Sequence, residues 1–227
     1  MNVFSLLARM KRGAAAAGVC LAVLGTGVGL AGQAQAAPSA GAAKPAILAG
    51  VSCVRPSWCM AVGTVFVAHG ATQSLSEIWN GTAWHLVASP SGSGLGGVSC
   101  SATWYCLALG TQGRQTPAFR WNGSKWLKVA EPRGAAGSPS CASRSNCVVG
   151  NSYAESVLTW NGSRWTNTQL CGGGPSSRCI TSTSCAGASL CMAVGWGLNE
   201  IYNSNASAHL WDGKQWSNSL LPNAEDE

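Results

Sequence analysis

Two glutamates in matching loops are the residues whose type and spacing come closest to catalysis. Glu155 and Glu200 follow apolar segments ending in glycine, in two neighbouring repeats of the chain. A glycoside hydrolase needs two carboxyl groups beside one bond, one as general acid and one as base or nucleophile. If these loops converge, the chain would be an extracellular polysaccharide hydrolase or lyase. The three histidines are not spaced as metal ligands, so we expect neither a metal nor a cofactor.

A second group of side chains suits binding rather than catalysis. Aromatic rings stack on sugars, and amide or carboxyl groups beside them supply hydrogen bonds. Some of these residues lie in the irregular loops, and the others are aromatic residues outside the regular repeat pattern. The ligand-binding candidates are Tyr153, Asn199, Glu200, Tyr202, Asn203, Trp58, Trp104, Tyr105 and Trp196.

These candidates are carried by a chain of four repeats. The phrase Trp-Asn/Asp-Gly-x-x-Trp begins at Trp79, Trp121, Trp160 and Trp211, and a pair of cysteines separated by five residues precedes each copy. The repeats are about 40 to 45 residues long, which is typical of propeller blades. We expect units at about 47–93, 94–137, 138–180 and 181–221, after a flexible lead-in at 37–46 and before a tail at 222–227.

The cysteines predict disulfides inside the repeats. Ten of the eleven cysteines lie beyond residue 36, and an even number in an exported chain favours pairing. A local pair is the only arrangement that all four repeats can share. The expected bridges are Cys53–Cys59, Cys100–Cys106, Cys141–Cys147 and Cys185–Cys191, with Cys171–Cys179 closing a loop.

Residues 1–36 have the pattern of a secretory signal peptide. Three basic residues precede an uncharged Ala/Gly/Val/Leu segment, and Ala34-Gln35-Ala36 matches a signal-peptidase site. We expect cleavage after Ala36, an extracellular location and no membrane span in the remaining chain. The basic residues left after cleavage are scattered, so a nucleic-acid partner is not expected.

Each repeat predicts four short strands and no helix. The first contains the Ser-Cys pair, and the second begins at the next cysteine as an apolar run, as in Met60-Ala61-Val62-Gly63. The third ends at the first tryptophan of the marker, and the fourth begins at the second. Asn-Gly between them favours a tight turn, because both residues tolerate positive φ.

This combination resembles the secreted β-propeller repeat proteins of bacteria, and more distantly the Asp-box and kelch-type propellers. The resemblance implies an all-β propeller of four repeat units, closed by itself or as part of a larger ring formed by two copies. In a four-stranded blade the cysteine turn and the tryptophan turn lie on one face, which leaves the variable loops on the other. We therefore expect a non-catalytic module that binds an extracellular or cell-surface ligand, such as a carbohydrate or a protein, through the variable loops. The alternatives are the polysaccharide hydrolase or lyase above and a structural protein of the cell envelope.

Overall fold

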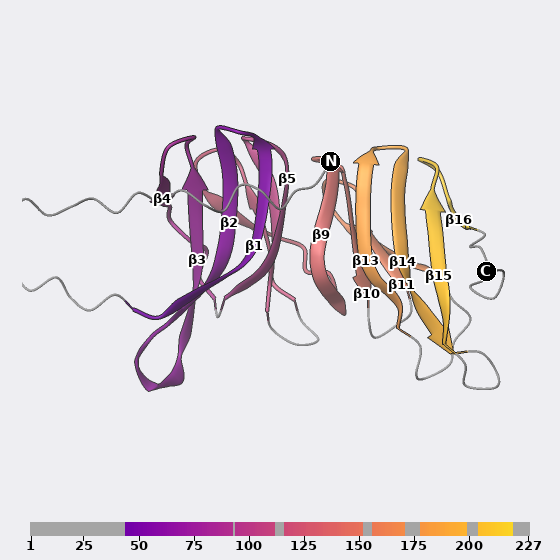
Figure 1. Cartoon of the computed structure of the whole chain (residues 1–227), viewed down its shortest axis with the longest axis horizontal. Helices are drawn as coiled ribbons and strands as arrows, with labels where there is room; N and C mark the ends of the chain where they lie inside the picture. The colour runs from indigo at the N-terminus through magenta and orange to yellow at the C-terminus, as the bar shows by residue number, and fades with distance from the viewer. Residues whose placement is uncertain are drawn as a thin grey trace, which may run out of the picture. The chain divides into compact units, whose positions relative to one another are not determined.

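Sixteen strands form four antiparallel sheets of four strands each in the described part of the chain (Figure 1). The computed structural model describes residues 44–92, 94–111, 116–151, 156–170, 178–198 and 204–219. The first sheet contains β1 (Ala46–Arg55), β2 (Trp58–Phe66), β3 (Thr72–Trp79) and β4 (Trp84–Leu86), and the second contains β5 (Leu95–Ala102), β6 (Tyr105–Gly110), β7 (Ala118–Trp121) and β8 (Trp126–Val129). The third contains β9 (Ala135–Ser143), β10 (Asn146–Asn151), β11 (Ser156–Trp160) and β12 (Trp165–Gln169), and the fourth contains β13 (Arg178–Gly187), β14 (Leu190–Leu198), β15 (Ser204–Trp211) and β16 (Trp216–Asn218).

Strand order in each sheet follows chain order, as expected for a repeated hairpin unit. Within these described ranges the one helical segment is η1 (Ala68–Gly70), a single 3-10 turn. No helix among the described residues is long and apolar enough to cross a membrane.

One disulfide closes the first hairpin of every sheet. The paired cysteines face one another directly across the two strands, as Cys53 and Cys59 do between β1 and β2. The other three bridges join Cys100 to Cys106, Cys141 to Cys147 and Cys185 to Cys191. The expected Cys171–Cys179 pair lies outside the residues whose side chains are described.

The tryptophan marker forms the second hairpin of every sheet. Its two indoles pack against each other, with ring centroids between 5.3 and 5.7 Å apart in the four copies. Only the glycine of the turn has positive φ, for example +101° at Gly81. The asparagine tolerates positive φ but does not adopt it in these turns. Its contribution comes from the side chain, because Asn80 Oδ1 accepts hydrogen bonds from the backbone N–H groups of Thr82 and Ala83, both at 2.9 Å.

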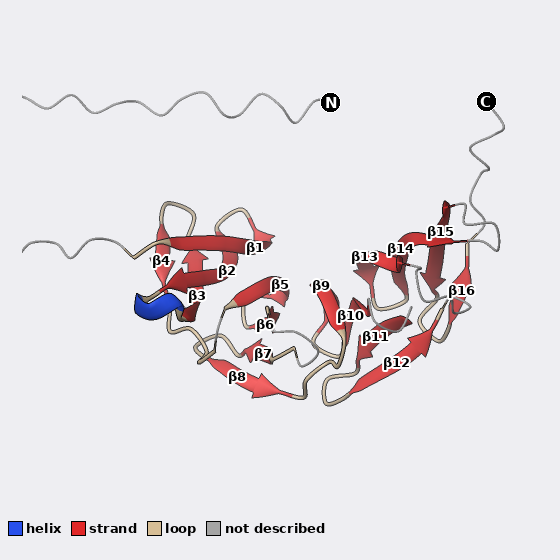
Figure 2. Ribbon diagram, turned by 90° about the horizontal axis from the view of Figure 1, so that it is seen from below, coloured by secondary structure: helices blue, strands red, loops and turns tan. Residues whose placement is uncertain are grey.

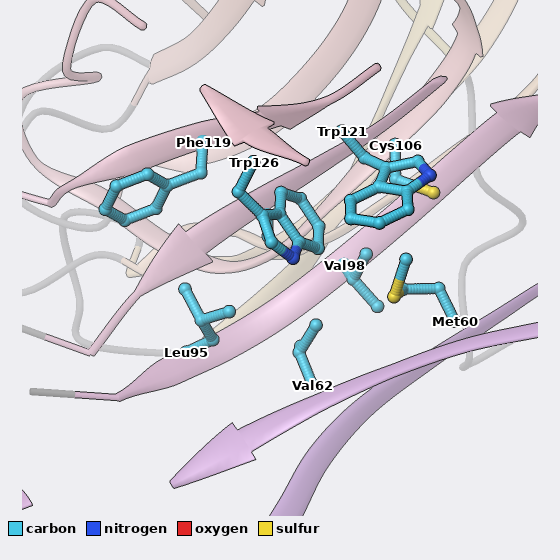
Figure 3. Packing of buried hydrophobic residues seen from close by; sticks show 9 residues of the cluster. Met60, Val62, Leu95, Val98, Cys106, Phe119, Trp121 and Trp126 are labelled. Carbon is cyan, nitrogen blue, oxygen red and sulfur yellow. The ribbon is translucent and has the colours of Figure 1, made fainter. Parts of the chain in front are cut away.

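The sheets pack in chain order, each against the next (Figure 2). We call the side of a sheet that turns toward the following sheet its leading face; in the first sheet it carries Met60 and Val62. The opposite side is the trailing face, represented in the second sheet by Cys106 and Ala108. These four side chains belong to one buried cluster, and Figure 3 shows Met60 and Val62 directed toward the tryptophans and valine of the second sheet.

The other two junctions repeat this arrangement. Leu107 and Leu109 of the second sheet pack on the third, beside Cys147 and Val149. Val148 of the third sheet packs on Cys191 of the fourth. Alternate residues of a strand point to opposite faces, so the apolar runs of β6 and β10 each serve two junctions at once. This explains why the run is apolar throughout rather than alternating.

Candidate functional site

The two kinds of hairpin turn meet at one edge of each sheet, which we call the turn edge. A Cβ added at Gly81 would lie 3.2 Å from Ser57 Cβ in the cysteine turn, and one at Gly213 would lie 3.0 Å from Ser189 Cβ. Trp79 Nε1 donates to Pro56 O at 3.1 Å, and Trp211 Nε1 donates to Ala188 O at the same distance.

Much of the polar chemistry at the turn edge is therefore used to hold the turns together. The asparagine of each marker is occupied in its own turn, and at the fourth turn Asp212 Oδ1 accepts the N–H groups of Lys214 and Gln215 at 2.8 Å. These backbone donors hold the pKa of the Asp212 carboxyl below its ordinary value. The side-chain oxygens of all four turns are thus engaged within the fold, which suits a scaffold rather than a recognition surface.

The opposite edge, which we call the loop edge, carries the connections between second and third strands and between successive sheets. Most of the predicted site falls on segments outside the described residues, so the structure does not report whether these side chains converge. They are Tyr153, Glu155, Asn199, Glu200, Tyr202 and Asn203.

Four of the predicted ligand-binding aromatics are described, and they lie in different surroundings. Trp58 packs against the first core cluster, at the junction of the first and second sheets. Tyr105 is only 2% exposed and lies at the next junction, so its ring is not available to a ligand, and burial raises the pKa of its phenol. Trp104 is exposed in the cysteine turn with its ring edge-on to Tyr105, and Trp196 is partly exposed on β14. The structure does not bring these four together.

A hollow of about 280 Å³ opens between the first strands of the third and fourth sheets. It lies where the pairing of each of these strands with its neighbour is interrupted. The pairing of β9 with β10 is interrupted between Val148 and Gly150 of β10, and that of β13 with β14 is interrupted between Arg178 and Ser182 of β13. Such bulges redirect side chains and are common beside functional sites. The lining is Gly137, Ser138, Pro139, Ser140, Gly150, Thr181, Ser182 and Thr183.

Five hydroxyl groups and no charged side chain line this hollow. Three of the hydroxyls are engaged: Ser140 Oγ accepts from Cys185 N at 2.8 Å, while the Thr181 and Thr183 hydroxyls donate to backbone carbonyls. Ser138 and Ser182 are exposed. The lining suits a neutral ligand rich in hydrogen-bonding groups. Sequence reasoning missed this hollow, although the run Thr181-Ser182-Thr183-Ser184 was a visible signal.

The acidic and histidine side chains of the described ranges are dispersed. Glu131 pairs with Lys128 at 2.9 Å, Asp212 is held in its turn, and Glu77 lies on the trailing face of the first sheet. No group of three or more His, Cys, Asp or Glu residues able to hold a metal ion occurs within those ranges.

Four four-stranded antiparallel sheets, each with a disulfide and each packed on the next, define a propeller-like repeat protein. Among solved structures, the chain is similar to YCF48 bound to D1 peptide, with 12% identity over 77% of this chain and 66% of that one, at a TM-score of 0.46. It is also similar to YCF48 from Cyanidioschyzon merolae, with 13% identity over 80% of this chain and 58% of that one, at a TM-score of 0.45. The chain thus matches two thirds or less of the length of these propellers. No protein-family model and no curated protein sequence matches it.

Proposed function

We propose that this protein is a secreted, non-catalytic binding module that presents its loop edge, together with the adjoining hollow, to an extracellular or cell-surface ligand. The observation that carries the proposal is the uncharged, hydroxyl-lined hollow between β9 and β13. Its chemistry favours a neutral polyhydroxylated ligand, such as the carbohydrate of a cell wall, over an anion or a metal.

The position of the hollow links it to the loops that the sequence singles out. Gly150 is the last residue but one of β10, and the loop that follows contains Tyr153. Thr181 lies near the beginning of β13, in the corresponding half of the fourth sheet. A ligand seated in the hollow would extend toward that loop, where an aromatic ring could stack on it.

Export is part of the same proposal. The signal pattern of residues 1–36 supports it, and the four disulfides fit an oxidising compartment. N-terminal sequencing of the chain recovered from the culture medium tests export. The expected result is a chain of residues 37–227 that begins at Ala37.

The test of ligand binding is a glycan-array and cell-wall pull-down with the disulfide-bonded chain of residues 37–227. Thr181→Leu, which places an apolar side chain at the hollow, and Tyr153→Ala should each weaken retention of the ligand. Trp104→Ala is the matched control, because it removes an exposed aromatic ring at the turn edge and should leave retention unchanged. Retention that survives both loop-edge changes and is lost in the control would reject the proposed placement.

A further inference from the structure

Two sheet faces at the ends of the stack are apolar and uncovered. On the leading face of the fourth sheet, Leu190, Met192, Val194 and Trp196 are 47%, 40%, 40% and 36% exposed. They occur at every second position of β14 and therefore point to one side. The equivalent residues in the first sheet, Met60 and Val62, are fully buried against the second sheet.

The trailing face of the first sheet is exposed on its outer strands, β1 and β4, while the small side chain of Ala61 between them on β2 is buried. Val51 pairs with Ala61 as Val98 pairs with Ala108 in the second sheet, yet Val51 is 62% exposed and Val98 only 5%. On β4, Trp84 and Leu86 extend this apolar surface. They pair with Trp79 and Glu77 of β3.

The uncovered faces also carry the two halves of a repeated hydrogen bond. At each internal junction a serine hydroxyl accepts the N–H of the first cysteine of the next sheet: Ser52 from Cys100, Ser99 from Cys141 and Ser140 from Cys185, at 2.8 to 2.9 Å. Ser184 holds the matching position on the fourth sheet, opposite Met192, and is exposed. On the first sheet, the matching donor is the N–H of Cys53.

We propose that these faces are the two halves of one further junction, formed between copies of this chain. The leading face of the fourth sheet of one copy packs on the trailing face of the first sheet of a second copy, with Ser184 Oγ accepting the N–H of Cys53. The contact continues a packing plan that the chain uses three times internally, which is why the occupant is a second copy. Because the two surfaces differ, the contact is heterologous, and two copies close a ring of eight sheets by forming it twice.

Glu77 makes the junction between copies weaker than the internal ones. It lies opposite Ala61 on the trailing face, where the other sheets place Phe119, Leu158 and His209. Packing a carboxylate against an apolar face carries a desolvation cost. Association should therefore depend on protein concentration.

Sedimentation velocity of the disulfide-bonded chain of residues 37–227, over a series of concentrations, tests the proposal. The expected particle has twice the mass of the chain. Met192→Glu and Val51→Glu should each weaken association at least about tenfold, because each buries an unpaired charge. Trp104→Glu, an equal change at an exposed site of the turn edge, should leave it unaffected.

Two further measurements separate a specific junction from general stickiness or misfolding. Glu77→Leu should strengthen association and keep the near-UV circular dichroism of the parent chain. A misfolded variant with an exposed core would also associate, but it would lose that signal. A mixture of the Met192→Glu and Val51→Glu chains retains one intact junction and should form mixed dimers. A monomer at every concentration, or equal association of Met192→Glu and the parent chain, overturns the proposal.

Discussion

Ser52 Oγ accepts a hydrogen bond from the backbone N–H of Cys100 at 2.9 Å, across the junction between the first and second sheets. The same bond joins Ser99 to Cys141 and Ser140 to Cys185. Each serine directly precedes a cysteine in the sequence. In the two middle sheets, the serine therefore bonds forward to the next sheet while the adjacent cysteine N–H bonds back to the preceding one. The Ser-Cys dipeptide couples neighbouring sheets as well as closing its own hairpin.

Removal of one such hydroxyl should destabilise the fold. Ser99→Ala leaves the N–H of Cys141 without its acceptor at a half-buried junction, and we expect a loss of about 1 kcal/mol in the free energy of unfolding. Urea denaturation measures the change. Ser184→Ala is the matched control at low protein concentration, because none of the described residues of the same chain bonds to its hydroxyl. An equal loss in both variants would contradict the assigned role.

Close approach of the first strands of the second and third sheets should make one glycine irreplaceable. A Cβ on Gly97 would lie 2.7 Å from Ser138 Cα, a backbone atom that cannot move aside. Gly97→Ala should cost about 1 to 3 kcal/mol of stability through overpacking, measured by thermal or urea unfolding. Gly96→Ala is its neighbour and control. The closest atom to its Cβ would be the Thr111 Cγ2 methyl, at 3.3 Å, and the backbone oxygens of Gly110 and Leu109 would lie at ordinary contact distances of 3.9 and 4.0 Å, so the change should be tolerated.

The sequence predicts the repeat, the strand order and the shared turn edge because all three follow from local spacing. A marker that ends one strand and begins the next locates a hairpin without knowledge of the tertiary structure. The sequence did not predict the burial of Tyr105. The residue before each second cysteine is Trp, Tyr, Asn or Leu, so this position was not recognised as part of the repeat. That position faces the next sheet in the first three units. The hollow was also missed, because it depends on interruptions of strand pairing that leave no periodic signal.

The turn asparagine should be replaceable by aspartate but not by alanine. Asn122 Oδ1 accepts the N–H groups of Ser124 and Lys125 at 3.0 and 2.9 Å. Asn122→Ala leaves both donors without this acceptor and should cost about 1 kcal/mol at neutral pH. Asn122→Asp retains them, as Asp212 does in the fourth repeat.

The aspartate variant should differ from its parent only in acid. Backbone donors hold the pKa of such a carboxyl below its ordinary value, as they do at Asp212. The folded state then gains stability above the unfolded pKa of about 3.9 and loses it as the pH falls through the lower folded value. Urea denaturation of both chains at pH 7 and pH 3 measures this difference. A loss at pH 7 as large as that of Asn122→Ala would show that the oxygen is not the required group.

His209 should make the stability of the fourth sheet depend on pH near neutrality. The side chain is 4% exposed on the trailing face, where the third sheet has Leu158, and its Nδ1 lies 2.9 Å from Asn218 Oδ1. Burial lowers the pKa of the imidazole, and the hydrogen bond to Asn218 opposes that effect only in part. A histidine held neutral in the fold binds a proton more readily when unfolded. Stability is therefore complete above the unfolded pKa of about 6.5 and falls as the pH drops below it.

Replacement by leucine tests this dependence, because the equivalent Leu158 shows that the position accepts an apolar chain of this size. His209→Leu should have nearly the stability of the parent at pH 8 and should lose less of it between pH 7 and pH 5. Guanidinium denaturation at several pH values measures both chains, and His85→Leu, at an exposed position of β4, controls for removal of a histidine as such. If the parent became more stable on acidification over this range, the conclusion that the fold lowers the pKa of His209 would be wrong. The same would follow if His209→Leu and His85→Leu reduced the pH dependence of stability equally.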